Sequence, residues 1–180
     1  MSEIKELTTE MELENSVKII ADSFATVAAE FKLTKENCPT HPSFVTLKQL
    51  SEMKRKGLKL FGIFTEGAQV GFVAVEKKKG KVFNLEKLAV LPDHRHKGYG
   101  SELCAFVDDF VKNAKGKTIS IGIINEHTVL KQWYISKGFH ETALTKFAHL
   151  PFTVCFMEKP LVIPDLIVND PTLLLFSKRK

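Results

Sequence analysis

The stretch from Val90 to Cys104, VLPDHRHKGYGSELC, decides the fold because it carries the chain from an apolar strand into a helix through a short basic loop. Arg95, Gly98 and Gly100 form the pattern Arg-x-x-Gly-x-Gly at this junction. Two interpretations are open at this point. Backbone N–H groups at a helix start can hold an anion, or the glycines can form an ordinary strand-to-helix turn.

The segments before this stretch predict a helical region followed by an antiparallel meander. We expect a short strand over 4–8, a helix over 12–31, and a second helix from an N-cap at Ser43 to Lys56. Three strand-like runs then follow within 58–91, and the turn sequences EG and KKGK separate them.

The third run of the meander is apolar on both faces, which is typical of a central strand covered by helices. Strict alternation places one apolar set on each face: Val82, Leu88 and Val90 on the first, and Phe83, Leu85, Ala89 and Leu91 on the second. The same alternation places Glu86 and Lys87 on opposite faces, so we expect no direct pair between them.

The segments after the stretch predict a crossover unit. A helical stripe from Leu103 to Ala114 leads into a strand within 116–124, and a strand–helix–strand unit of this length makes the two strands parallel neighbours. A helix ending at Gly138 as its C′ residue and two strands, around 140–147 and 152–158, complete the pattern.

These elements predict an α+β fold, an α/β/α sandwich. Its central sheet is mixed and mostly antiparallel, with a β-meander and one βαβ crossover, and helices cover both faces. We expect one domain over 1–159. The extension 160–180, which contains three prolines and LLLF, is expected to pack on the domain or at a dimer interface.

Composition excludes several functional classes. The 180 residues carry a formal charge of +5, but the lysines fall in short runs such as KKKGK at apparent turns, without interleaved aromatic residues. We therefore expect no nucleic-acid partner. The N-terminus is acidic, and no apolar run reaches the roughly 20 residues of a membrane span, so no membrane partner is expected either.

The cysteines indicate neither disulfides nor a metal site. Cys38, Cys104 and Cys155 are odd in number and far apart, with no Cys/His spacing of a metal centre. Reduced structural cysteines fit a cytoplasmic protein, and we expect no metal cofactor.

Taken with its context, LEKLAVLPDHRHKGYGSELC resembles the acetyl-CoA-binding motif of the GNAT superfamily of N-acyltransferases. The later segment WYISKGF is similar to a second motif of that family, and the order of elements agrees over about residues 4–159. The resemblance implies that backbone N–H groups of the loop grip the pyrophosphate of coenzyme A, a role that falls on Arg95, His96, Lys97, Gly98, Tyr99, Gly100 and Ser101. It also implies that the pantetheine arm pairs with the strand at Leu88, Ala89 and Val90.

The resemblance also suggests the catalytic residues. Tyr134 matches the tyrosine that serves as general acid in the family, although a packed tyrosine whose hydroxyl only bonds the CoA sulfur is the alternative. Glu86 is the candidate general base, and a surface or salt-bridged glutamate is its alternative. The family pattern has an asparagine seven residues before the tyrosine, where this chain has His127. Asn125 lies nine residues before it, so it is either a cofactor ligand or an N-cap.

The sequence thus predicts an acyl-CoA-dependent N-acyltransferase that moves an acetyl group from acetyl-CoA to a primary amine by direct attack in a ternary complex. The alternative is a catalytically inactive CoA-binding regulatory module of the same fold. The acceptor, a small-molecule amine or a peptide or protein amine, stays open, with His41 and Phe44 in the region expected to contact it. The apolar tail is compatible with a homodimer.

Overall fold

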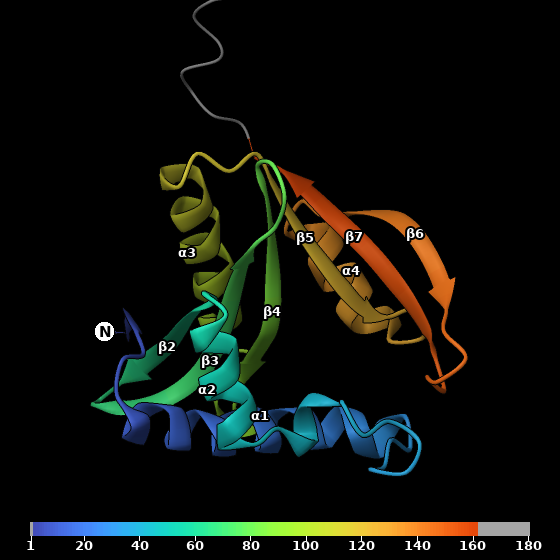
Figure 1. Cartoon of the computed structure of the whole chain (residues 1–180), viewed down its shortest axis with the longest axis horizontal. Coiled ribbons are helices and arrows are strands. Elements are labelled where there is room, and N and C mark those ends of the chain that lie inside the picture. Colours follow the sequence, from blue (N-terminus) through green and yellow to red (C-terminus); the bar gives the residue numbers. More distant parts are fainter. Residues whose placement is uncertain (1, 162–180) are drawn as a thin grey trace, which may run out of the picture.

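The computed structural model describes residues 2–161, which form a seven-stranded sheet covered by helices (Figure 1). The helices are α1 (Glu10–Glu30), α2 (Leu47–Arg55), α3 (Tyr99–Asn113) and α4 (Thr128–Ser136), with short 3₁₀ helices η1 (Pro42–Phe44) and η2 (Pro92–His94). The strands are β1 (Ser2–Glu6), β2 (Lys59–Thr65), β3 (Ala68–Lys77), β4 (Val82–Val90), β5 (Thr118–Ile124), β6 (His140–Lys146) and β7 (Thr153–Pro160).

The sheet has the order β1-β2-β3-β4-β5-β7-β6, and only β4 and β5 pair in parallel. The predicted meander and crossover are therefore confirmed. Leu60 on β2 packs with α1 and α2, whereas its neighbour Phe61 packs with α3, so adjacent residues serve the two layers of the core. The predicted α+β sandwich with helices on both faces is confirmed.

The prediction of strict alternation along β4 is wrong. Phe72 faces Ala89 and Ala74 faces Glu86, so two residues of β4 oppose one residue of β3, which is a β-bulge. Lys87 lies in this bulge with φ of +53°. After it the faces exchange, so that Phe83 and Leu85 share the α3 layer with Leu88 and Val90, while Ala89 and Leu91 pack in the α1 layer.

The second helix also begins later than predicted. Ser43 lies in η1, and α2 starts at Leu47 after the N-cap Thr46. The Thr46 side chain accepts the N–H of Gln49, and the Gln49 side chain accepts the N–H of Thr46, which forms a capping box. This reciprocal pair satisfies two N–H groups at the start of α2. The predicted C′ glycine of α4 is confirmed, because Gly138 has φ of +92°.

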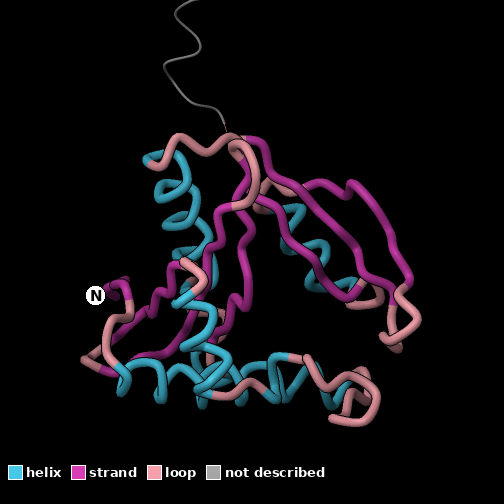
Figure 2. The backbone as a smooth tube through the Cα atoms, viewed as in Figure 1, coloured by secondary structure: helices cyan, strands magenta, loops and turns pink. Residues whose placement is uncertain are grey.

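β4 and β5 part soon after they meet. Their pairing covers only Val82–Thr118, Phe83–Ile119 and Asn84–Ser120. Beyond these pairs the strands diverge toward α1, which runs across the open end of the wedge (Figures 1 and 2). The sheet thus has two arms, β1–β4 and β5–β7. The expected packing of the extension 160–180 falls almost wholly outside the described residues.

Candidate functional site

The loop between β4 and α3 presents a row of open backbone donors. Within residues 2–161, the N–H groups of His96 through Ser101 donate to no protein acceptor. His96 has φ of +60° and Gly98 has φ of +93°, so left-handed residues alternate along the loop and turn its N–H groups into one concavity. Together with the start of α3, this arrangement suits a phosphate group.

Glycine is required at two positions of the loop, Gly98 and Gly100, for different structural reasons. Gly98 is the N-cap of α3 in a left-handed conformation, which strains any residue with a Cβ atom. A Cβ on Gly98 would meet only Glu102 Oε1 at 3.8 Å, so conformation and not space requires glycine here. At Gly100, a Cβ would lie 3.4 Å from Trp133 Cζ2, where α3 approaches α4 closely.

The Arg95 side chain ties the loop to α1. Its Nη2 donates to Ser23 O at 2.7 Å and to Thr26 Oγ1 at 3.1 Å, and its Nε donates to Val90 O at 3.3 Å. In the structure the guanidinium braces the loop, and Lys97 is the exposed cation of the motif.

A cavity of about 840 Å³ occupies the wedge between β4 and β5. Glu86 and Leu88 line it from β4, and Ile121 and Ile123 line it from β5. Further walls come from α1, η1, α4 and β7. Of the predicted site residues, the cavity therefore collects Glu86, Leu88 and Tyr134. The loop Arg95–Ser101 lies outside its lining, at the helix start that follows β4.

Glu86 is part of a polar chain at the point where the two strands part. Asn84 Nδ2 donates to Glu86 Oε1 at 3.0 Å, and Ser120 Oγ donates to Asn84 Oδ1 at 3.2 Å. Lys87 Nζ lies 3.4 Å from Glu86 Oε2, so the prediction that these two do not pair is wrong. The bulge at Lys87 breaks the alternation on which that prediction rested.

Asn84 and Ser120 were missed by sequence reasoning. They are 36 residues apart and meet only because β4 and β5 pair in this register. The predicted crossover gave the pairing of the strands but not its register.

Tyr134 lies on α4 with only 5% of its surface exposed, and it lines the cavity. Its ring packs edge-on against Trp133 and Phe139, with centroid distances of 4.9 and 5.3 Å. Burial raises the pKa of the phenol well above its ordinary value, and Cys104 adds to that shift. The hydroxyl is therefore a proton donor throughout the neutral range.

Asn125 and His127 have different surroundings. Asn125 Oδ1 accepts a hydrogen bond from Lys131 Nζ at 2.9 Å, and Asn125 does not line the cavity. His127 occupies the N-cap position of α4, without a side-chain cap, and it does line the cavity. Its ring lies 5.5 Å from that of Phe31 on the segment after α1.

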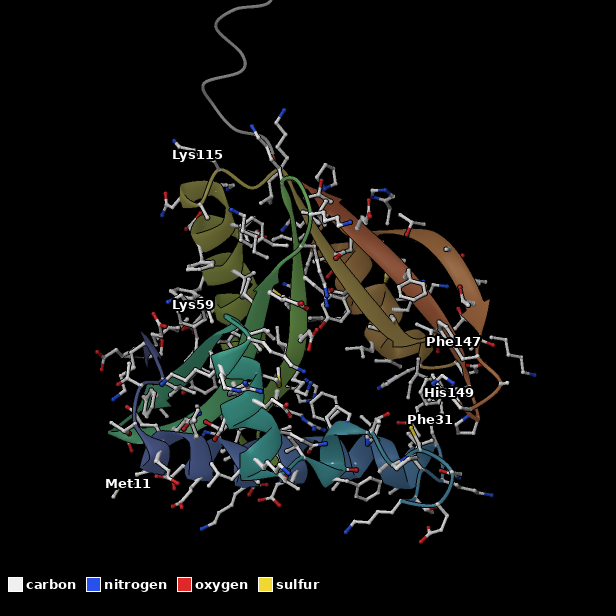
Figure 3. The ribbon with its side chains drawn as sticks, viewed as in Figure 1. Met11, Phe31, Lys59, Lys115, Phe147 and His149 are labelled. Atoms are coloured by element: carbon white, nitrogen blue, oxygen red, sulfur yellow. The ribbon has the colours of Figure 1, made fainter. Side chains whose placement is uncertain are left out.

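The end of the cavity near α1 is aromatic and apolar. His41 is 7% exposed, and its ring packs edge-on against Phe24 and Phe44 at 5.7 and 6.3 Å. Burial lowers the pKa of His41, so the imidazole is neutral at pH 7. Leu150 and Phe152, from the β6–β7 loop, pack against the cluster at the end of α1. Figure 3 labels Phe31 at the end of α1 and, above it in this view, His149 and Phe147 of the β6–β7 loop.

The cysteines are buried free thiols with raised pKa values. Burial raises the pKa of Cys104 to about 12, and it also raises the pKa of Cys38 and of Cys155. Such thiols are poor nucleophiles. Over residues 2–161, no group of three metal-ligating side chains occurs. No helix in that range is both long and apolar enough to cross a bilayer.

A family model described as an acetyltransferase (GNAT) domain matches residues 56–141. The ribosomal-protein-S18-alanine N-acetyltransferase from Escherichia coli superposes with a TM-score of 0.72 at 17% identity, covering 89% of this chain and 94% of that one. The PaiA N-acetyltransferase from Thermoplasma acidophilum, solved with coenzyme A, gives 0.68 at 17% identity, covering 89% and 99%. A ribosomal-protein-alanine N-acetyltransferase from Brucella melitensis gives 0.66 at 20% identity, covering 88% and 99%. At these identities the likeness to the solved structures concerns the fold.

Proposed function

We propose, from the premise that this chain belongs to the GNAT acetyltransferase family, that it transfers an acetyl group from acetyl-CoA to a primary amine. The observation that carries the proposal is the wedge between β4 and β5, whose β4 arm continues into a loop with N–H groups open from His96 to Ser101. An anionic, elongated thioester suits this pairing of an extended cavity with a phosphate cradle.

The loop residues His96 to Ser101 hold the pyrophosphate through their backbone N–H groups. The N–H of Arg95 instead donates to Pro92 O, and the Arg95 side chain keeps the loop against α1. Leu88, Ala89 and Val90 offer the open edge of β4 to the pantetheine arm. A backbone N–H of this segment also supports the negative charge that develops on the thioester oxygen. Coenzyme A supplies the activated acetyl group and a thiolate leaving group.

Two side chains carry out the proton transfers. Glu86, on the cavity wall, accepts a proton from the substrate ammonium, directly or through one water, and the neutral amine then attacks the thioester carbon. Tyr134, whose phenol is protonated at neutral pH, donates a proton to the departing thiolate. The buried thiols of Cys38, Cys104 and Cys155 support direct transfer without an acyl-enzyme.

The acceptor enters from the side of α1, η1 and the β6–β7 loop. Apolar and aromatic groups dominate that end, and the cavity as a whole is lined by few charged groups: Lys78, Glu86, Lys87 and Glu158. This lining favours an acceptor that has one amine and an apolar body. A polycationic acceptor would need several carboxylates in the cavity lining.

Release of free CoA thiol from acetyl-CoA tests the proposal. Purified protein is incubated with a panel that contains an arylalkylamine, an amino acid amide, a short peptide with a free N-terminus and spermidine. We expect amine-dependent thiol release that Glu86→Gln lowers. Binding of acetyl-CoA without turnover on every amine class would instead support the non-catalytic module.

A further inference from the structure

Asn84 and Ser120 form a relay that crosses from β4 to β5, and we propose that these two residues, with Lys87, position the Glu86 carboxylate for proton transfer. The inference rests on the proposed role of Glu86 and concerns three further residues that line the same cavity. They act through Glu86 and are therefore positioning residues.

The hydrogen-bond chain has a single consistent direction. A carboxylate only accepts hydrogen bonds, so the amide NH₂ group of Asn84 must face Glu86 Oε1, 3.0 Å away. The amide oxygen then faces Ser120, whose hydroxyl donates to it at 3.2 Å. Ser120 therefore fixes the amide in the orientation that serves Glu86, although its hydroxyl also lies 3.4 Å from Phe83 O.

The location of the relay explains how it can hold Glu86 in place. Asn84 and Ser120 face each other as the last paired residues before β4 and β5 diverge. Glu86 lies two residues farther along β4, on the wall of the cavity. The relay thus braces the carboxylate at the closed end of the wedge, where the strands are held by their own ladder.

Lys87, the residue in the bulge, holds the second carboxylate oxygen of Glu86. Lys87 takes the left-handed conformation, and its Nζ reaches Glu86 Oε2 on the same strand at 3.4 Å. Their side chains are 22% and 28% exposed, so the pair lies at the cavity wall and is partly shielded from water. Both oxygens of Glu86 are therefore held, one by an amide and one by a cation.

Other charged groups near Glu86 come from the elements around the cavity. Lys78, which follows β3, pairs with Glu76 at 2.5 Å, Glu158 lies on β7, and neutral His41 lies before η1. The residue opposite Glu86 on β3 is Ala74, which carries no charge. Lys78 therefore offers a matched control, since it is a cation on the same cavity wall with its own carboxylate partner.

The test follows the carboxyl carbon of Glu86 by ¹³C NMR during a pH titration, with Glu86→Gln to assign the signal. In Asn84→Asp a second carboxylate adjoins Glu86, and we expect the titration midpoint to move up by about one unit or more. Lys87→Met moves it up by a smaller amount, because an opposite charge is lost. Lys78→Met leaves it within about 0.3 unit of the wild-type value.

Kinetics then separate positioning from structure. We expect Ser120→Ala to lower kcat about tenfold while the KM for acetyl-CoA and the melting temperature stay unchanged, and Asn84→Asp to move the acid limb of the pH–rate profile upward. Unmoved midpoints in both Asn84→Asp and Lys87→Met would overturn the relay. Full turnover by Glu86→Gln would also overturn it, yet leave acetyl transfer standing. Absence of turnover by the wild type on the whole amine panel would overturn the proposed function, and the NMR titration would still decide whether the contact exists.

Discussion

Tyr134 is buried among aromatic rings, and its phenol keeps its proton because burial raises its pKa. We expect Tyr134→Phe to lower kcat by about 10²–10⁴-fold, the usual cost of losing a general acid. Acetyl-CoA affinity and melting temperature should change little, because the ring and its contacts with Trp133 and Phe139 remain. Steady-state kinetics beside a thermal melt measure this. A Tyr134→Phe enzyme with wild-type kcat would remove Tyr134 from the mechanism.

The buried cysteines lead to a second prediction for single residues. Because burial raises the pKa of Cys104 to about 12, almost no thiolate exists at pH 7.5. We expect no acetyl adduct in intact-mass spectra of protein mixed with acetyl-CoA, and retained turnover in Cys38→Ser, Cys104→Ala and Cys155→Ala tested one at a time. A mass increase of one acetyl group on any of the three would replace direct transfer by an acyl-enzyme route.

The loop before α3 is held to α1 by one side chain, Arg95, and this contact joins two elements about 70 residues apart in sequence. We expect Arg95→Gln to lower the free energy of unfolding by about 1–2 kcal/mol, as for loss of a charge-assisted hydrogen bond. Acetyl-CoA affinity should fall as well, because the loop loses its brace.

Lys97→Gln is the contrasting variant for Arg95, because Lys97 is an exposed cation of the same loop. We expect it to leave the unfolding free energy unchanged and to weaken acetyl-CoA binding in a salt-dependent way. Urea unfolding without ligand compares the two variants. Equal stability of Arg95→Gln and the wild type would show that the guanidinium does not brace the loop.

α1 starts with a capping box in which Glu12 accepts the N–H groups of Thr8 and Thr9, at 2.9 and 3.0 Å. These hydrogen bonds lower the pKa of Glu12 from 4.5 to about 2. Because the folded-state pKa is the lower one, this stabilisation is present above about pH 4.5 and is lost as the pH falls toward 2.

We therefore expect Glu12→Ala to cost about 1–2 kcal/mol of unfolding free energy at pH 7 and much less near pH 2.5. Glu14→Ala, at an exposed position on the same helix, is the control and should change stability by less than about 0.5 kcal/mol at either pH. Urea unfolding at the two pH values measures the difference. A cost for Glu12→Ala that does not vary with pH would contradict the cap.

At the scale of the molecule, periodicity predicted the order of elements and the parallel neighbours β4 and β5, because each apolar stripe has one face to bury. It failed at Lys87, since a bulge depends on pairing with β3 and leaves no local signal. It also placed the start of α2 at Ser43, because Ser43 and Thr46 are both acceptable caps and only the partner Gln49 distinguishes them.

The candidate site was predictable where a short motif carries it and not where tertiary contacts form it. Two parts of the site are recognisable in the sequence: Tyr134, and the loop from Arg95 to Ser101. The relay from Ser120 through Asn84 to Glu86 depends on the register of β4 against β5. The role of the Arg95 side chain depends on the position of α1 relative to the loop. Neither property is encoded in the spacing of residues.

The measurement that tests the central claim most directly is a calorimetric titration of acetyl-CoA into the wild type, Gly98→Ala and Gly80→Ala. Both glycines have positive φ, but Gly80 lies in an open turn with nothing within 4 Å of a Cβ. We predict saturable binding by the wild type and by Gly80→Ala, and at least about tenfold weaker binding by Gly98→Ala, whose loop N–H groups are displaced. No binding by the wild type at millimolar acetyl-CoA, or equal affinity in all three proteins, would contradict the account.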